Sequence, residues 1–122
     1  MKLFLAPLLV LLLCGHAGLA NAASGREAIT LKEYSKVKNE EWFKAYVSGA
    51  GRALGFANAV LKRRKERPLS CEPTDIPLYQ QNFLDILDRE VKFAEQTSTA
   101  TPDTEVALLL LMGLQSTFPC KP

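Results

Sequence analysis

Residues 41–61 read EWFKAYVSGAGRALGFANAVL, and this stretch decides the fold. Apolar side chains recur in it at spacings of three and four, the pattern of a long amphipathic helix. The apolar stripe comprises Trp42, Phe43, Tyr46, Val47, Ala50, Leu54, Ala57 and Leu61. Asn39, followed by two glutamates, predicts the beginning of this helix, and Pro68 ends it. We expect the aromatic residues of the stripe, Trp42, Phe43 and Tyr46, to belong to the hydrophobic core.

Three glycines interrupt this helix, at Gly49, Gly51 and Gly55. Each costs about 1 kcal/mol relative to alanine in a helix interior, so their presence needs a reason. The sequence leaves two reasons open. Either another backbone packs very close to the helix at these positions, or the helix is kinked there.

Two further helices are predicted on either side of this one. Thr30 and Glu33 form a capping box, which starts a short helix directly after Thr30. A third helix is predicted over roughly Leu78–Glu95, whose apolar residues again recur at helical spacing, with Pro77 in its first turn.

The last helix is predicted to begin at Thr101, with Pro102 just inside its first turn. Its Val106–Met112 segment is apolar on every side, which is typical of a helix surrounded by others. No hairpin pattern occurs in the sequence. The predicted fold is therefore all-α, a small bundle of about four helices stapled by one disulfide.

The first residues carry the features of a secretory signal peptide. A short positive start precedes the apolar run Leu3–Cys14, and the small residues of Ala20–Ala22 form a cleavage site. We predict a cleaved signal peptide over residues 1–22 and one domain over residues 23–122, located in the periplasm. Removal of the signal peptide takes away Cys14 and His16, so the mature chain has two cysteines and no histidine.

The two remaining cysteines, Cys71 and Cys120, belong to an exported chain and are expected to form a disulfide. A loop of about 50 residues closed in this way stabilises the fold by up to roughly 4 kcal/mol in the chain-entropy model. A redox-active pair would favour closer spacing, as in Cys-x-x-Cys, and a zinc site would need more ligands.

The mature chain is poorly equipped for catalysis. Without histidine it has neither a Ser-His or Cys-His nucleophile nor the commonest general base near neutral pH. We expect no enzymatic activity, no catalytic residues, no metal and no cofactor. The nearly balanced charge gives no reason to expect nucleic-acid binding, and the apolar run is too short for stable membrane insertion.

Several motifs of the chain resemble the Rap/Tai family of periplasmic immunity proteins, which neutralise peptidoglycan amidases delivered by bacterial type VI secretion. They are Trp42-x3-Tyr46-x2-Gly49, Cys71-x-Pro73 with Gln80, and the terminal Phe118-Pro119-Cys120. The resemblance extends over about residues 41–120. It implies a helical toxin inhibitor, commonly a homodimer, that blocks the active-site cleft of a cognate amidase effector.

Two polar segments are candidates for contact with such a partner. The candidate binding loop comprises Gln96, Thr97, Ser98, Thr99, Ala100 and Thr101, which lie between predicted helices. A plain solvated connector is an equally good interpretation of this loop. The basic cluster Lys62–Arg67 fits an acidic cleft rim, although positive charge at a helix C-terminus is already explained by the helix dipole.

Two other functions remain open from the sequence. One is a periplasmic acid-stress chaperone, which would also be small, helical, dimeric and disulfide-linked. The other is an envelope-associated binding module without a toxin partner.

Overall fold

The computed structural model describes residues 28–121, which form four helices: α1 (Leu31–Val37), α2 (Glu41–Arg63), α3 (Gln80–Thr97) and α4 (Val106–Thr117). The described residues contain no strand, only an isolated antiparallel bridge between Thr30 and Glu105. The predicted all-α fold of about four helices with one disulfide is confirmed. The predicted signal peptide, residues 1–22, lies outside the described residues. None of the helices over residues 28–121 is long and apolar enough to cross a membrane.

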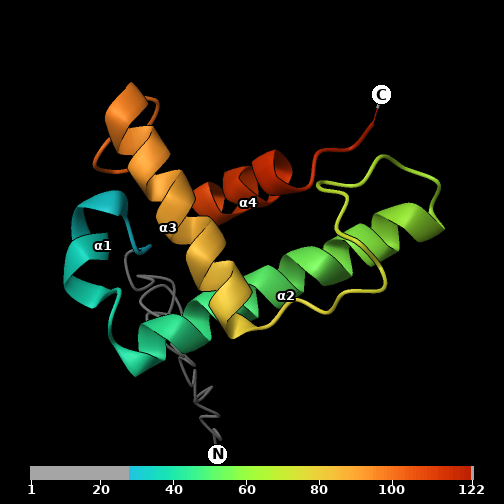
Figure 1. The fold of residues 1–122 in the computed structure, drawn as a ribbon, viewed down its shortest axis with the longest axis horizontal. Helices are drawn as coiled ribbons and strands as arrows, with labels where there is room; N and C mark the ends of the chain where they lie inside the picture. The colour runs from blue at the N-terminus through green and yellow to red at the C-terminus, as the bar shows by residue number, and fades with distance from the viewer. Residues whose placement is uncertain (1–27, 122) are drawn as a thin grey trace, which may run out of the picture.

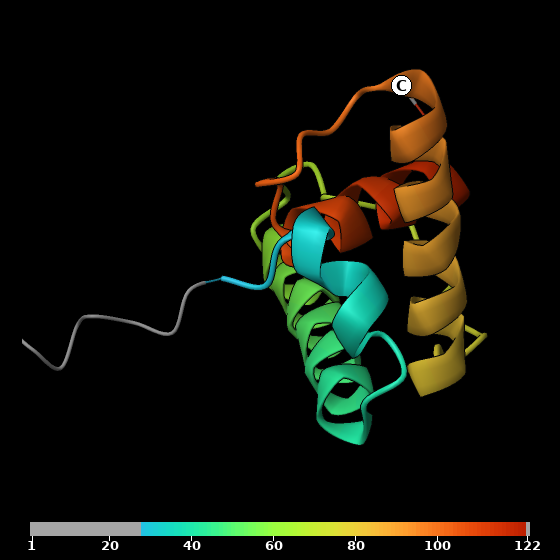
Figure 2. The same cartoon turned by 90° about the vertical axis from the view of Figure 1, so that its left-hand side faces the viewer.

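The long helix α2 lies along one edge of the fold, and the other helices lie on one side of it (Figures 1 and 2). Helix α3 begins beside α2 and runs away from it, so that its C-terminal end is remote from α2. Helix α4 contacts both α3 and α2. This arrangement leaves one long face of α2 without a covering helix in the described chain.

The core lies where α2, α3 and α4 meet, and it is almost entirely aliphatic and aromatic. Phe43, Leu87, Leu109 and Leu114 have no exposed surface. The buried apolar residues are Tyr34, Phe43, Val47, Phe83, Ile86, Leu87, Val91, Ala94, Val106, Leu109, Leu110 and Leu114. Helix α4, which was predicted to be surrounded, is buried on one side only: Val106, Leu109, Leu110, Gly113 and Leu114 are buried, whereas Leu108 is 49% exposed.

Close packing accounts for one of the three glycines of α2. A Cβ atom at Gly51 would lie 2.4–2.6 Å from three ring carbons of Phe83 in α3, which is inside van der Waals contact. Gly113 allows a similar approach, because its Cβ would lie 2.8 Å from Ile86 Cγ2 and 3.1 Å from the Ile86 carbonyl oxygen. Gly49 and Gly55 have no atom within 4 Å of such a Cβ. Of the three α2 glycines, only Gly51 therefore serves packing within the described chain.

Two helices begin later than predicted. Glu40, not Asn39, is the N-cap of α2. Helix α3 begins at Gln80 instead of Leu78, because Asn82 Oδ1 accepts a hydrogen bond of 2.7 Å from the Tyr79 N–H and fixes the start there. Pro77 consequently lies before the helix, in the connecting loop.

The start of α4 was predicted five residues too early. Thr101 and Pro102 form a turn instead, in which the Thr104 N–H donates to the Thr101 carbonyl over 2.9 Å. The N–H groups of Leu31 and Lys32 donate to the carbonyls of Thr104 and Pro102, respectively. Pairing with the first turn of α1 therefore keeps residues 101–105 out of α4, and no local sequence pattern predicts this pairing.

Tyr34 attaches α1 to the rest of the fold. Its ring meets Phe43 edge to face at a centroid distance of 5.8 Å, and its hydroxyl donates to Asp88 Oδ1 over 3.2 Å. Burial raises the pKa of the Tyr34 phenol, and the Asp88 carboxylate adds to the effect. A hydrogen bond from Lys92, assisted by that from Tyr34, lowers the pKa of Asp88.

The close approach at Gly51 predicts opposite effects of two glycine substitutions in α2. Gly51→Ala forces its methyl group against the Phe83 ring and is expected to lower the free energy of unfolding by about 1–2 kcal/mol. Gly55→Ala meets open space and is expected to raise it by up to about 1 kcal/mol through helix propensity. Urea unfolding followed by circular dichroism measures both. Equal stabilisation by the two alanines would contradict the packing role of Gly51.

The Tyr34–Asp88 contact predicts a pH-dependent loss of stability in Tyr34→Phe. The lowered pKa of Asp88 means that its ionised form stabilises the fold above its unfolded pKa of about 4, and that this contribution is lost as the pH falls through the folded pKa. Tyr34→Phe should cost about 1 kcal/mol at pH 6 and less near pH 2. Tyr79→Phe, at an exposed tyrosine, is the control and should change nothing at either pH. A pH-independent difference would show that only packing changed.

Candidate functional site

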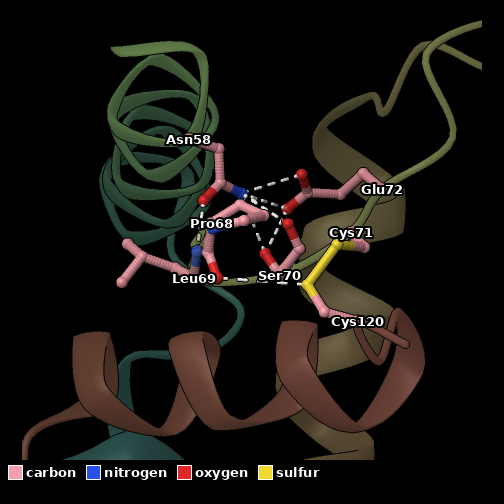
Figure 3. The surroundings of a disulfide bond; sticks show 7 residues. All are labelled: Asn58, Pro68, Leu69, Ser70, Cys71, Glu72 and Cys120. Carbon is pink, nitrogen blue, oxygen red and sulfur yellow. Dashed lines mark hydrogen bonds between the residues drawn. A yellow bond between two sulfur atoms is a disulfide. The ribbon is translucent and has the colours of Figure 1, made fainter. Parts of the chain in front are cut away.

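The disulfide Cys71–Cys120 joins the loop before α3 to the end of the chain after α4, with a Cα–Cα distance of 5.0 Å (Figure 3). The backbone reinforces this connection, because the Cys71 N–H donates to the Phe118 carbonyl over 2.8 Å. The predicted pairing is thus confirmed. The cysteines hold the loop between α2 and α3 against the C-terminal end, at a corner of the fold.

Asn58 of α2 holds the same corner from the other side (Figure 3). Its side chain is buried, with 2% exposed, and its Oδ1 accepts a hydrogen bond of 2.7 Å from the Leu69 N–H. Its Nδ2 lies 3.1 Å from the Ser70 carbonyl and 3.0 Å from Glu72 Oε2. Ser70 in turn donates to Glu72 Oε1 over 2.6 Å. Since each of these buried polar groups has a partner, this network is a structural support rather than a vacant binding site.

The candidate binding loop is shorter than predicted. Gln96 and Thr97 belong to the last turn of α3, and Ser98 ends the helix in the left-handed conformation with φ 54°. Ser98, Thr99, Ala100 and Thr101 form the first half of the connection to α4, and all of them but the half-buried Ala100 are exposed. Helix α3 thus continues beyond the last apolar residue of its pattern, and the Thr97 hydroxyl in its last turn donates to the Phe93 carbonyl over 2.7 Å.

The loop Ser98–Thr101 is held in place at both ends. The Thr99 N–H donates to the Ala94 carbonyl over 3.2 Å, and the Thr101 N–H donates to Thr104 Oγ1 over 2.9 Å. A shallow depression of about 470 Å³ lies beside it, lined by Leu31, Lys32, Ser35, Ala94, Glu95, Ser98, Ala100 and Pro102. A polar protrusion with fixed ends next to a depression is suited to contact with another protein, whose docking then costs little ordering entropy.

The basic cluster Lys62–Arg67 forms the end of α2 and the turn after it. Lys65 adopts φ 58°, and the Glu66 N–H donates to the Leu61 carbonyl over 2.9 Å. These are the features of a Schellman motif with lysine at the position that glycine usually occupies. All six residues are exposed. The cluster is thus a well-formed helix end that displays five cations and one carboxylate to solvent.

The prediction for the aromatic residues at the start of α2 was partly wrong. Phe43 is fully buried, but Trp42 and Tyr46 are 53% and 37% exposed. They belong to a second stripe that lies beside the core-facing one on α2 and continues through Phe56 and Val60, which are 73% and 37% exposed. The signal was present in the sequence, since positions 42, 46, 49, 53, 56 and 60 alternate in spacings of four and three. The two stripes are interleaved along the sequence, so they resemble a single broad apolar stripe.

The described residues offer little chemistry beyond these surfaces. Within residues 28–121, no three side chains of His, Cys, Asp or Glu come together in a way that could hold a metal ion. Among the residues that the structure describes, Glu90 is the one buried carboxylate, and it accepts a hydrogen bond of 3.3 Å from Ser116 Oγ. It lies in a groove of about 480 Å³ between α3 and α4, beside Arg89 and Phe93.

Comparison with known proteins gives no match, whether with family models, curated proteins or solved structures.

The Asn58 network predicts unequal effects of two asparagine substitutions. Asn58→Ala leaves the Leu69 N–H and the Ser70 and Glu72 acceptors without their partner, so it is expected to lower the free energy of unfolding by about 2–3 kcal/mol. Asn82→Ala removes an exposed cap of α3 and should cost about 1 kcal/mol. Both variants keep the disulfide, which thiol titration verifies. Urea unfolding yields the two values, and a smaller loss at Asn58 than at Asn82 would refute the role of the network.

Proposed function

We propose that this chain is a periplasmic immunity protein of the Rap/Tai type, which binds a peptidoglycan amidase effector of type VI secretion and blocks its active-site cleft. The resemblance of three sequence motifs carries this proposal. Two of them, Cys71-x-Pro73 and Phe118-Pro119-Cys120, contain the cysteines of the disulfide. The disulfide links these two motifs, so both belong to one structural feature of the fold, and this supports the proposal.

A cleft-blocking inhibitor requires a rigid body and a segment that projects from it. The described helices form the rigid body, since the core, the disulfide and the Asn58 network fix their positions. The loop Ser98–Thr101 is the best candidate for the projecting segment. It follows the end of α3 that is remote from α2, so a partner can reach it without contact with α2 (Figure 1).

Inhibition of a purified amidase effector tests the proposal. The mature chain is mixed with effectors from strains that compete with its host, and release of peptide from peptidoglycan is measured. We expect one such activity to fall to the background at a molar ratio near one. Thr99→Arg in the loop should weaken the inhibition at least tenfold, whereas Gln81→Arg, at the opposite end of α3, should leave it unchanged.

Two results would contradict the proposal. One is that no effector of this class is inhibited, the other that a deletion strain survives attack by its parent as well as the parent itself does. If inhibition occurs but Thr99→Arg has no effect, the immunity function holds and the loop is not the inhibitory segment.

The exposed apolar stripe of α2 favours a second candidate function, that of a chaperone that exposes apolar surface when it dissociates in acid. This function predicts suppression of the light scattering of an unfolded client at about pH 2–3. The immunity function predicts no such protection.

A further inference from the structure

We infer that the outward face of α2 docks on the surface of an anionic lipid bilayer, with the helix lying in the plane of the lipid headgroups. The outward face consists of Trp42, Tyr46, Arg52, Phe56, Val60 and Arg63, all of which are exposed. The other exposed residues between Trp42 and Val60 are alanines and glycines. Helices α3 and α4 pack against the core side of α2 and leave this face uncovered.

The aromatic residues of the outward face suit the headgroup region of a membrane. Trp42, Tyr46 and Phe56 have exposed fractions of 53%, 37% and 73%, and together they present roughly 300 Å² of surface, since one such ring can bury about 150–250 Å². Patches of this size are among the largest on soluble monomers and are often functional. Tryptophan and tyrosine are enriched at membrane–water interfaces, because the ring contacts acyl chains while the N–H or O–H stays hydrated.

The charges of α2 make an anionic partner the complementary one. From Trp42 to Lys65 the chain contains six cations and no acid. The cations are Lys44, Arg52, Lys62, Arg63, Arg64 and Lys65. The acid in the first turn of α2, Glu41, is already paired, since its Oε1 lies 2.6 Å from Lys44 Nζ. Basic amphipathic helices of this kind bind anionic lipid surfaces, to which each lysine or arginine adds affinity.

Two of these cations lie within the outward face. Arg52 precedes Phe56 by four residues and Arg63 follows it by seven, so all three share one side of the helix. An arginine amid apolar residues in a protein interface needs a carboxylate partner. At a membrane, the long arginine side chain reaches the lipid phosphates while its apolar neighbours contact the acyl chains.

Two other interpretations of the outward face fit its charges less well. A second copy of the chain would bring the same surface to it, and with it further cations against Arg52. An ordinary solvated helix face carries both signs of charge. The exposed side of α3 is of that kind, with Asp85, Arg89, Lys92 and Glu95.

The fold presents the outward face to a flat surface and leaves the loop Ser98–Thr101 free. Helix α2 has 23 residues, about 34 Å in length, and lies along one edge of the fold (Figures 1 and 2). The loop follows the end of α3 that is remote from α2. A chain docked through α2 therefore directs this loop away from the lipid.

Binding to vesicles tests the inference, and Trp42 reports it because it is the only tryptophan of the chain. The disulfide-bonded mature chain, residues 23–122, is mixed with phosphatidylcholine vesicles that contain either about one-third phosphatidylglycerol or none. With the anionic vesicles we expect the Trp42 emission to shift to shorter wavelength, and an affinity at least about tenfold higher than for the neutral ones. Raising the salt from about 0.1 M to about 1 M should weaken this binding several-fold, because the Debye length falls from about 10 Å to about 3 Å.

Matched variants separate the outward face from the net charge of the chain. Arg52→Glu should weaken binding at least about tenfold, since each cation near an anionic surface contributes roughly fivefold. Arg89→Glu on α3 changes the net charge equally and should weaken binding by less than about threefold. Phe56→Ser should weaken it at least about fivefold, whereas Phe93→Ser, at an exposed aromatic residue of α3, should leave it unchanged. Circular dichroism verifies that all variants fold.

Site-specific labels test the orientation. The native disulfide does not react with a maleimide, so a cysteine introduced by Ala53→Cys or Thr99→Cys takes up the same environment-sensitive fluorophore alone. Ala53 lies among the residues of the outward face, and Thr99 lies in the loop. Anionic vesicles should shift the emission of the label at position 53 and leave that of the label at position 99 unchanged.

Three results would overturn the inference. The first is that the wild-type chain does not bind anionic vesicles at low salt. The second is an equal loss of binding in Arg52→Glu and Arg89→Glu, which would mean that only net charge matters. The third is a Trp42 shift that grows with protein concentration in the absence of lipid, which would assign the face to a second copy.

These measurements do not depend on any amidase. A chain that inhibits an effector without binding vesicles would refute only the lipid contact, and a chain that binds vesicles but inhibits no effector would refute only the immunity function.

Discussion

Two missing Cβ atoms set the distances between the helices of this fold. Gly51 of α2 lets the ring of Phe83 lie directly against the helix backbone, and Gly113 of α4 receives Ile86 in the same way. Phe83 and Ile86 both belong to α3, which therefore packs closely against both α2 and α4. Any side chain larger than hydrogen at either glycine would push α3 outward and open the core around Leu87, which is fully buried.

The disulfide and the Asn58 network extend this packing to the segments that the core does not reach. The connection between α2 and α3 is 16 residues long and contains no helix or strand, and such a segment has few ways to stay ordered. Cys71 ties its middle to the end of the chain, and Asn58 pairs with its backbone at Leu69 and Ser70. The covalent and the polar contacts thus replace hydrophobic contacts where the chain is too short to provide them.

The helices could be predicted because their apolar spacing is a local property. Their ends were less predictable, since the beginning of α4 depends on backbone pairing with Leu31 and Lys32, far away in the sequence. For the same reason the sequence could not tell which glycine of α2 packs closely, because only the position of Phe83 distinguishes Gly51 from its neighbours. The candidate sites also differ in how far the sequence predicts them. The cysteine pair could be predicted, whereas the exposed stripe of Trp42, Tyr46, Phe56 and Val60 could not be told from the core stripe beside it.

The position of the basic cluster relative to the disulfide has a consequence for proteolysis. Residues Lys62–Arg67 form an exposed turn rich in lysine and arginine, the residues after which trypsin-like proteases cut. Cys71 and Cys120 both lie on the C-terminal side of this turn. A single cut there would therefore divide the chain into an α1–α2 fragment and a cross-linked α3–α4 fragment with no covalent bond between them. The two fragments would then remain together only through noncovalent contacts, among them the packing of Gly51 against Phe83 and the hydrogen bonds of Asn58 and Tyr34.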